Sequence, residues 1–569
     1  MALNVENSAD GFDRYYWLEY LDHYFPLKMR VGERAMAFVS IRNQGNWQWL
    51  RHDPNGHPVD LAVWNEDRLL ATHPLPQNSV NPNEQVIFHF PFEAPAQPGL
   101  HKLKVGLVHQ NVVLFSGKNV PSLQISVEVG LREPTQGEEN RDLVIAIQEK
   151  ARISPWYYRP SGGIQRTRDG IAMPEFTSKA SGAYLWDVQG RRYLDYVMGW
   201  GSAVLGYAEP RIQDALRQAL GTGVLTPFPY AVEMEVATNV VDDFPCAEMV
   251  VFGKNGSDAC TVAARLARAY TRKNVILHCG YHGWQDFWVE QVGMEWTGVP
   301  DRAESLIHGF RFNDQEHFEN LFNIHRDNLA AIMLEPSGPG QSIQGNFQEP
   351  DSGFLELLSS SAKESGSLLI YDEIMTGYRH RHGSAQKATG VIPDLVCLGK
   401  ALGGGMPLSA LAGRAEIMQG AMARTHYGPT FKGEYLSFIS ANVAQRIFRE
   451  ESVAEYIHAY GTCLRDGLND ILHANGYPAS CMGPPWRMSI VFAEDDPHRL
   501  RMIRTYYQQE LLKEGIVTYH GIFLPSYAHS QDDLVRTLEA ADRVFRKLFN
   551  DIDMAQIERA LEIPLLPDR

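Results

Sequence analysis

The sequence predicts two kinds of fold in one chain, an all-β sandwich followed by an α/β domain on a mainly parallel sheet. Up to about residue 130, short strands are separated by turn clusters such as "NPNE" and "PAQPG". Beyond a polar stretch at 131–142, continuous apolar runs alternate with helical stretches, which is typical of a sheet buried on both faces. At 569 residues, the chain is also too long for one hydrophobic core.

The N-terminal part is expected to be an antiparallel sandwich of immunoglobulin type, because several short strands follow one another at close spacing. In the run 123–129, apolar residues alternate with polar ones, so one face points to a core and the other to water. The strands are expected at 35–41, 86–90, 101–108 and 123–129.

Two tryptophans in this part, Trp47 and Trp49 in "GNWQW", allow two interpretations. They could form an exposed aromatic platform for a sugar or a protein, or they could pack in the core of the sandwich. The polar, Pro- and Gly-containing stretch 131–142 is typical of a linker.

Composition excludes several classes of protein. The net charge of −16 argues against a nucleic-acid partner, which would need clustered Lys and Arg. No run of eighteen apolar residues and no N-terminal signal pattern occurs, so neither a membrane span nor secretion is expected. Six cysteines without any CxxC pair predict no metal knuckle and a reduced, cytoplasmic setting.

In a parallel sheet the ligand lies at the carboxyl ends of the strands, so the residues after each apolar run are the candidate site. The first such run, 249–253, leads into a helix whose apolar positions keep a four-residue spacing. Gly256 and Ser257 stand at the start of this helix. Ser257 is a candidate N-cap, and free N–H groups there either form an anion site or simply cap the helix.

Aromatic and acidic residues follow the next three runs. Tyr281 stands beside glycine and could stack on a flat ligand, and His282 is either structural or an acid–base group. Glu335, Asp372 and Glu373 end apolar runs, where a carboxylate needs a positive partner. That partner is either a protonated ligand nitrogen or a structural arginine.

Lys400 stands at the end of the run "DLVCLGK". A partly buried amine has a lowered pKa and is partly neutral and nucleophilic near pH 7. A nucleophilic lysine, an anion site, an aromatic ring and a carboxylate together are what pyridoxal phosphate requires. A nucleotide-binding P-loop is excluded because Asp394 and Ala401 occupy the positions of its glycine and its Ser or Thr.

Six stretches resemble the class III aminotransferases of the fold-type I pyridoxal phosphate enzymes, nearest to the branch of glutamate-1-semialdehyde aminomutase. The similarity runs over roughly residues 155–550 and implies a mainly parallel seven-stranded sheet with helices on both faces and a small α+β domain. The sandwich, which is not part of the resemblance, is expected at 1–131, followed by a linker or helix at 132–153. The resemblance implies a large cofactor-binding domain at 154–435, with the N-terminal segment of the small domain at its start, and a small C-terminal domain at 436–569. The stretches are "YLDYVMGWGSAVLGYAEP", "FGKNGSDACTVAARLARAYT", "GYHGW", "LEP", "YDEIMTGYR" and "LGKALGGGMPLSALAGR".

The resemblance also implies roles for individual residues. Lys400 would form the Schiff base, and Asp372 would bond the ring nitrogen. Substrate contacts would come from Trp200 and Gly201, with Arg166 and Arg168 as candidates for a carboxylate-binding arginine or a surface salt bridge. No metal ligand is implied. The remaining cofactor contacts would be Gly256, Ser257, Tyr281, His282, Glu335, Ile374 and Thr430, the last reaching a neighbouring subunit of a homodimer.

The implied reaction transfers an amino group from a small amine donor, with glutamate as the first to consider, to an aldehyde or ketone. The second candidate is a glutamate-1-semialdehyde-type aminomutase. It is disfavoured because "EPSGPG" lacks the asparagine of the mutase motif, and the segment after "GYHGW" lacks its Gly/Ser-rich stretch. The third candidate is a non-catalytic binding or scaffold protein that uses the sandwich.

Overall fold

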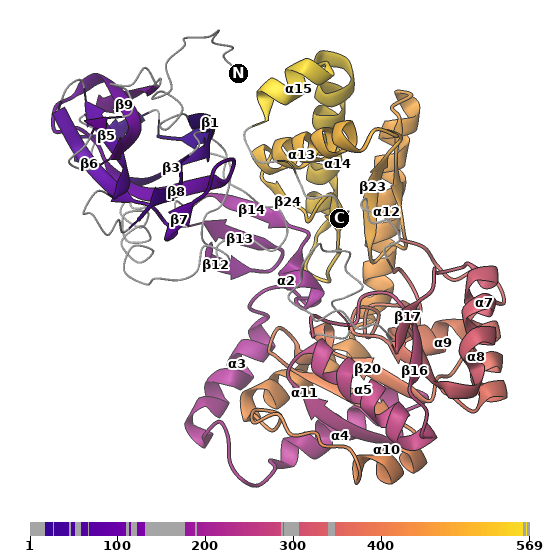
Figure 1. Ribbon diagram of the computed structural model, residues 1–569. Helices are drawn as coiled ribbons and strands as arrows, with labels where there is room; N and C mark the ends of the chain where they lie inside the picture. The colour runs from indigo at the N-terminus through magenta and orange to yellow at the C-terminus, as the bar shows by residue number, and fades with distance from the viewer. Residues whose placement is uncertain are drawn as a thin grey trace. The chain divides into compact units, whose positions relative to one another are not determined.

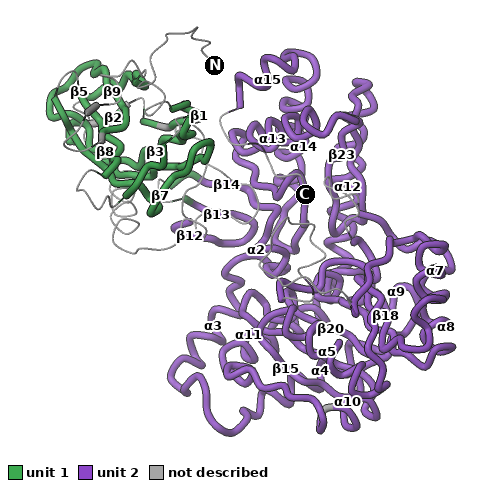
Figure 2. Tube along the Cα trace, in the orientation of Figure 1, with its two compact units in different colours: residues 1–176, 187–191 green, residues 177–186, 192–569 purple. Residues whose placement is uncertain are grey.

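The computed structural model describes residues 18–26, 28–32, 34–44, 47–51, 58–65, 68–109, 113–114, 122–130, 177–187, 190–285, 288, 306–339, 347–561 and 565. The chain divides into two compact units (Figure 2). Unit 1 comprises Met1–Phe176 with Asp187–Arg191, and unit 2 comprises Thr177–Trp186 with Arg192–Arg569.

Unit 1 consists of two sheets around one apolar core, drawn in indigo in Figure 1. The first sheet has the order β1 (Leu18–Tyr24), β3 (Arg34–Asn43), β8 (Gln85–Glu93). The second has the order β2 (Lys28–Arg30), β11 (Leu123–Gly130), β9 (Gly99–His109), β5 (Val59–Asn65), β6 (Arg68–Pro74), with β10 (Val113–Leu114) on β9. A separate pair joins β4 (Trp49–Leu50) to β7 (Ser79–Val80).

These strands confirm the all-β prediction, and β11 buries Ile125, Val127 and Val129 while its polar residues face water. One pair differs from the antiparallel expectation, because β2 pairs with β11 in parallel. The chain leaves the first sheet after β1 at Pro26, which has no N–H for a ladder, and then joins the second sheet. Trp49 is fully buried in the core and Trp47 packs against it, so an exposed platform is wrong for Trp49.

Unit 2 is centred on the predicted seven-stranded sheet (Figure 1). All strands run parallel except β21, which is antiparallel to both of its neighbours. The strand order is β15 (Met249–Gly253), β21 (Ser409–Gly413), β20 (Leu395–Leu398), β19 (Leu368–Asp372), β18 (Leu329–Leu334), β16 (Val275–Cys279), β17 (Ile307–Gly309).

Helices cover both faces of this sheet, as predicted, and neighbouring residues of one strand therefore enter different apolar clusters. Leu369 and Tyr371 of β19 belong to one cluster, whereas Leu368 and Ile370 belong to the other. The helices are α3 (Pro210–Ala219), α4 (Ala231–Asp243), α5 (Gly256–Thr271), α7 (Gln315–His325), α8 (Phe354–Ser365), α9 (Ala385–Thr389), α10 (Ala415–Met422) and α11 (Tyr435–Glu450). Short turns are α2 (Met198–Gly201), η3 (Leu220–Thr222), η5 (Arg326–Asn328), η6 (Arg381–Gly383) and η7 (Lys400–Gly403).

The C-terminal part of unit 2 adds two small sheets with a third apolar cluster. One sheet combines strands from far apart in the chain, in the order β12 (Thr177–Ser181), β13 (Tyr184–Asp187), β14 (Arg192–Asp195), β24 (Ile516–Val517). The other is β22 (Ala479–Met482), β23 (Met488–Phe492), β25 (Ile522–Phe523). The helices here are α12 (Val453–Ala474), α13 (Pro497–Lys513), α14 (Gln531–Arg546), η8 (Lys547–Asp551) and α15 (Met554–Ala560).

The six cysteines all lie in described positions, and each is a free thiol. Among the described residues, no helix has both the length and the apolar content needed to cross a membrane.

Candidate active site at the carboxyl ends of the sheet

The candidate site lies where the parallel strands of unit 2 end. Asp372 is the last residue of β19, and Lys400 begins η7 two residues after β20. Glu335 follows β18 directly, and the segment 280–282 follows β16. These side chains share one edge because parallel strands present their carboxyl ends on the same side of a sheet.

Asp372 is buried and its carboxylate has three hydrogen-bond donors. Nδ1 of His282 lies 2.8 Å from Oδ2, and the thiol of Cys260 donates to the same oxygen at 3.4 Å. The backbone N–H of Ile374 donates to Oδ1 at 3.1 Å. The carboxylate is therefore fixed in orientation by hydrogen bonds to both of its oxygens. His282 therefore contacts Asp372. Its contact with a cofactor stays a prediction.

The ligand atoms of Cys260, His282 and Asp372 lie within 4.8 Å of one another, a spacing that a metal ion could bridge. In this structure they are engaged with each other through the hydrogen bonds to Oδ2. The buried thiol of Cys260 has a pKa raised well above its usual value, first by loss of hydration and then by Cys397 and Asp372. A neutral thiol is a poor metal ligand, and Cys260 and His282 both contact Oδ2 of Asp372, so the cluster supports the carboxylate.

Lys400 has the properties of a nucleophilic amine. Its pKa is lowered to about 8, first by burial and then by the positive charge of Arg487, against the opposing effect of Glu335 and Asp372. Its backbone φ is 44°, a left-handed conformation that is uncommon for a residue with a Cβ atom. Strain of this kind is concentrated at functional sites.

Glu335 has an arginine partner, one of the two possibilities that the sequence left open. Nη1 of Arg487 donates to Oε2 at 2.9 Å, while the backbone N–H of Tyr281 donates to Oε1 at 2.9 Å. The guanidinium of Arg487 also lies over the ring of Phe347, 4.2 Å from its centroid. Glu373, by contrast, has no such partner within 4 Å among the described residues and accepts from the Thr376 hydroxyl and the Ala385 N–H.

Helix α5 starts beside these groups, but its cap differs from the expectation. Asn255 is the capping residue, and its N–H donates to the carboxylate of Asp258 at 2.9 Å. Ser257 is therefore wrong as the N-cap, because it already lies in the first helical turn, where its N–H has no acceptor four residues earlier. Gly256 and Ser257 still present their N–H groups at the positive end of a sixteen-residue helix, which suits a phosphate.

Three of the predicted residues, Gly256, Ile374 and Tyr281, have the surroundings that contact with a flat ring needs. A Cβ atom on Gly256 would lie 2.6 Å from Cδ1 of Ile374, so only glycine allows this approach. The side chain of Ile374 also lies against Gly399, which precedes Lys400. The ring of Tyr281 is 60% exposed and is open to stacking. Pyridoxal phosphate needs a phosphate site, a carboxylate, a ring for stacking and an amine that can be neutral. The start of α5, Asp372, Tyr281 and Lys400 fit these four needs.

The remaining predicted residues are placed as follows. Trp200 is partly exposed in α2, where its ring meets the edge of Tyr519 at 4.7 Å between centroids. Thr430 lies exposed in the turn before α11. Arg166 and Arg168 lie outside the described residues.

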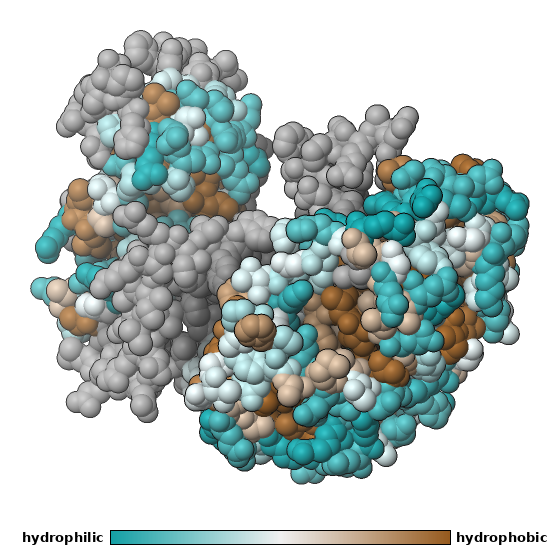
Figure 3. Space-filling view, turned by 90° about the horizontal axis from the view of Figure 1, so that it is seen from below, coloured by the Kyte–Doolittle hydropathy of each residue, from teal (hydrophilic) through white to brown (hydrophobic). Residues whose placement is uncertain are grey.

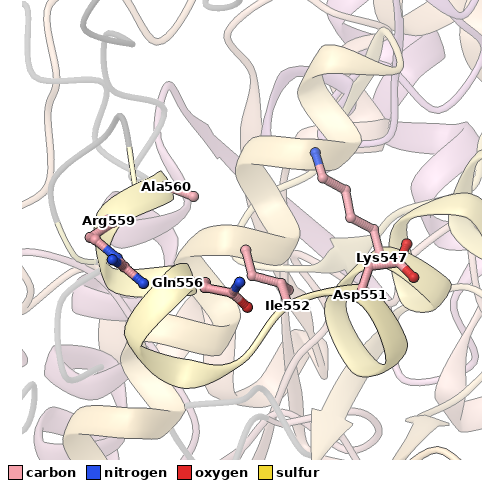
Figure 4. Close-up of a pocket in the computed structure, with 6 residues that line it drawn as sticks. All are labelled: Lys547, Asp551, Ile552, Gln556, Arg559 and Ala560. Atoms are coloured by element: carbon pink, nitrogen blue, oxygen red, sulfur yellow. The ribbon is translucent and has the colours of Figure 1, made fainter.

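A hollow in the described part of the chain lies elsewhere, between η8 and α15 (Figure 4). Its volume is about 490 Å³ and none of the predicted site residues lines it. The ammonium group of Lys547 is paired with Glu510, so it is not a free cation for a ligand. The hollow is lined by Lys547, Asp551, Ile552, Gln556, Arg559 and Ala560.

Sequence reasoning missed three buried or half-buried residues around this site. Arg487 contacts Glu335, Cys260 contacts Asp372, and Arg379 donates to the carbonyl of Gly201. Arg487 is 152 positions from Glu335, and no local pattern marks it. In the sequence, Cys260 is not distinguished from the small apolar residues around it in the helix. Arg379 carried a usable signal, because a charged residue follows shortly after the buried strand that ends at Asp372.

Comparison with known proteins identifies the family to which this chain is similar. The family model for class III aminotransferases ("Aminotransferase class-III") matches residues 166–540. The 3-aminobutyryl-CoA aminotransferase of Cloacimonas acidaminovorans (strain Evry) is 31% identical over 370 residues, which covers 64% of this chain and 88% of that protein.

Solved structures show the same similarity. The FumI protein of Sphingopyxis sp. MTA144, in its PLP internal aldimine form, is 26% identical with a TM-score of 0.66, covering 76% of this chain and 99% of that one. A glutamate-1-semialdehyde aminomutase from Pseudomonas aeruginosa PAO1 is 20% identical with a TM-score of 0.59, covering 66% of this chain and 88% of that one. At that identity, the likeness to the aminomutase supports the fold alone.

Proposed function

The chain belongs to the class III aminotransferases, which are pyridoxal phosphate enzymes, and we propose that Lys400 carries the amine that bonds the cofactor. The observation that carries this proposal is the lysine's environment. Lys400 lies at the carboxyl ends of the sheet, with a pKa lowered to about 8 by burial and by Arg487. A neutral amine at neutral pH is what an attack on an aldehyde requires.

When bound, pyridoxal phosphate supplies an aldehyde that binds amines and a ring that withdraws electrons from the substrate carbon. The protein's share of the work follows from the geometry. Asp372 would bond the ring nitrogen, because hydrogen bonds from three groups fix the orientation of its carboxylate. The free amine of Lys400 would move a proton at the substrate carbon.

Binding and orientation fall to the surrounding residues. The N–H groups of Gly256 and Ser257 would hold the phosphate at the start of α5. Tyr281 and Ile374 would face the two sides of the ring. Glu335 would act near the cofactor and at the same time hold the backbone at Tyr281.

The donor proposed is an amino acid such as glutamate, and the support is Arg487. One of its terminal nitrogens is used by Glu335, and a guanidinium has further donors for a carboxylate. The acceptor proposed is an aldehyde or ketone of a small molecule. Because a relative is named for 3-aminobutyryl-CoA, a 3-oxoacyl thioester belongs in the first panel of acceptors.

We further propose a homodimer in which Thr430 reaches the phosphate of the partner subunit. Thr430 is exposed, and the carbonyl of Val224 accepts from the N–H of Tyr435 nearby in the same chain. Figure 3 shows apolar groups gathered on the face of unit 2 that is seen from below. Large exposed apolar side chains around this turn are Leu220, Val224, Leu225, Phe228, Met234 and Phe431. Such a concentration is typical of a surface covered by a partner.

Domain boundaries at 131, 153 and 435 belong to the same proposal. Under it, Arg487 and Tyr519 come from the small domain and Lys400 from the large domain. The substrate would then bind where these two parts of unit 2 meet.

The test is a visible absorption spectrum of the purified protein, repeated after adding glutamate alone. We expect a cofactor band that glutamate converts to the amino form, since the first half-reaction needs no acceptor. A band that glutamate leaves unchanged would reject glutamate as donor. Product formed from one substrate with no acceptor would instead identify the aminomutase reaction. No band after adding pyridoxal phosphate would contradict the proposed function.

A further inference from the structure

Four consecutive residues beside Lys400 adopt left-handed backbone conformations. The φ angles are 48° for Met198, 57° for Gly199, 59° for Trp200 and 81° for Gly201. Glycine tolerates this region, but residues with a Cβ atom do so only under strain. Strain persists where the surroundings hold it, and two of these four residues carry side chains.

Two buried charged groups hold this turn from opposite ends. At its start, the carboxylate of Asp195 accepts from the N–H groups of Val197 at 2.7 Å and Met198 at 3.2 Å. At its end, Nη2 of Arg379 donates to the carbonyl of Gly201 at 2.8 Å. The turn is therefore held by hydrogen bonds to these two side chains, and not by the intrinsic backbone preference of Met198 and Trp200.

Arg379 is unusual because it is fully buried without an acid. No described carboxylate lies within 4 Å of it, and its other acceptors are the carbonyl and the sulfur of Met375. Burial, and then the charge of Arg487, lowers its pKa to about 9, so it remains charged at neutral pH. A buried cation is costly unless hydrogen bonds compensate it, and here these bonds go to the backbone of two segments.

Those two segments belong to the candidate site. Met375 lies three residues after Asp372, and the turn α2 packs against η7, which begins at Lys400. The fit is close, because a Cβ atom on Gly201 would lie 3.3 Å from both terminal nitrogens of Arg379. Arg379 thus ties the segment that carries Asp372 to the turn beside Lys400.

The turn presents an aromatic surface. Trp200 is 44% exposed and meets the edge of Tyr519 at 4.7 Å. A flat apolar group gains most from such a surface, through face and edge contacts with the rings.

We propose that Arg379 is a positioning residue that holds the left-handed turn 198–201, and that the turn selects substrates with a flat, apolar group near the reacting carbon. The selection of substrates rests on the proposed function, whereas the positioning by Arg379 does not. The two parts are tested separately.

The first test is amide hydrogen exchange on the cofactor-loaded protein, comparing Arg379→Met with the matched control Arg381→Met. Arg381 lies two residues further on, is exposed, and its Nε donates to Nδ1 of His458, which is outside the turn. We expect exchange of residues 199–203 to rise at least about tenfold in Arg379→Met only. In Arg379→Lys, which keeps the charge, the exchange rate of these residues should lie between those of the two other variants. Wild-type protection of the turn in Arg379→Met would overturn the positioning role, and exchange that rises equally in both variants would overturn it too.

The second test measures equilibrium binding of phenylacetate and acetate to the loaded protein by calorimetry, which needs no turnover. We expect the wild type to bind phenylacetate at least about tenfold more tightly than acetate. Trp200→Ala, a change at a partly exposed side chain, should remove that preference while keeping the cofactor band. Equal binding of the two anions by the wild type, or a preference that survives Trp200→Ala, would overturn the selection. A wild-type protein that shows no cofactor band after loading would instead contradict the proposed function.

Discussion

The core of unit 1 and the sheet edge of unit 2 bury very different groups. The sandwich core is apolar, with Trp49 and Phe88 among its most buried side chains. The sheet edge that carries Lys400 buries Asp372, Glu335 and Arg379, which follow or end strands β18 and β19. Apolar burial stabilises a fold, whereas buried charge lowers stability unless it is paired. The first region is thus built for stability, and the second keeps costly groups because the chemistry needs them.

Replacing Lys400 with alanine should have the largest effect of any single change. We expect turnover to fall by at least about four orders of magnitude, because both the cofactor bond and proton transfer are lost. Folding should be unaffected or improved, since a buried amine with a lowered pKa is removed. Steady-state kinetics and thermal unfolding would be measured side by side.

Lys363→Ala is the matched control, since this lysine is exposed on α8. It should leave turnover and stability unchanged. Full activity in Lys400→Ala would contradict the account.

The opposite pattern is expected for Trp49→Ala in unit 1. Deleting a fully buried tryptophan should destabilise the sandwich by about 3–5 kcal/mol, because a large cavity is left in its core. Turnover per folded molecule should not change, since none of the candidate site residues lies in the described strands of the sandwich, which end at Gly130. Chemical denaturation followed by tryptophan fluorescence, with activity assayed before unfolding, would measure both. If Trp49→Ala lowered kcat and left stability unchanged, the sandwich would serve catalysis and not stability, contrary to this account.

The lowered pKa of Lys400 predicts a pH dependence for loading the cofactor. Its pKa of about 8 means that the amine is mostly protonated at pH 6 and mostly neutral above pH 8. The loading rate should rise about tenfold per pH unit below 8 and level off above it. Stopped-flow absorbance with cofactor-free protein would follow it. A rate that keeps rising to pH 10 would show an ordinary lysine.

The smallest effect should come from Leu100→Ser on the outside of the sandwich. Leu100 is 68% exposed in β9, so the free energy of unfolding should change by no more than about 0.5 kcal/mol. Denaturant titration would test this beside Trp49→Ala. A loss comparable to that of Trp49→Ala would mean that exposure does not separate the two positions.

Much of the fold could be predicted because burial leaves a regular mark on the sequence. The alternation in 123–129 and the unbroken apolar runs before Asp372 and Lys400 became β11, β19 and β20. Residues at strand ends could be placed for the same reason, because topology brings these ends together. The prediction failed where one residue decides the outcome, as at Asn255, which caps α5 in place of Ser257.

Partners from distant segments could not be predicted. Arg487 meets Glu335 across 152 positions, and Arg379 meets Gly201 across 178. Nothing in the local sequence encodes such pairs, since they depend on how β23 and α2 pack against the sheet edge. The parallel pair of β2 and β11 is a similar case, because it follows from a sheet switch at Pro26.

The most direct test of the account is to identify the lysine that carries the cofactor. The loaded protein would be reduced with borohydride, which makes the bond to the cofactor permanent, then digested and mapped by mass spectrometry. The account predicts the label on Lys400 alone, with none in Lys400→Ala. A label on another lysine of the wild type, or an unchanged label in Lys400→Ala, would contradict the central claim.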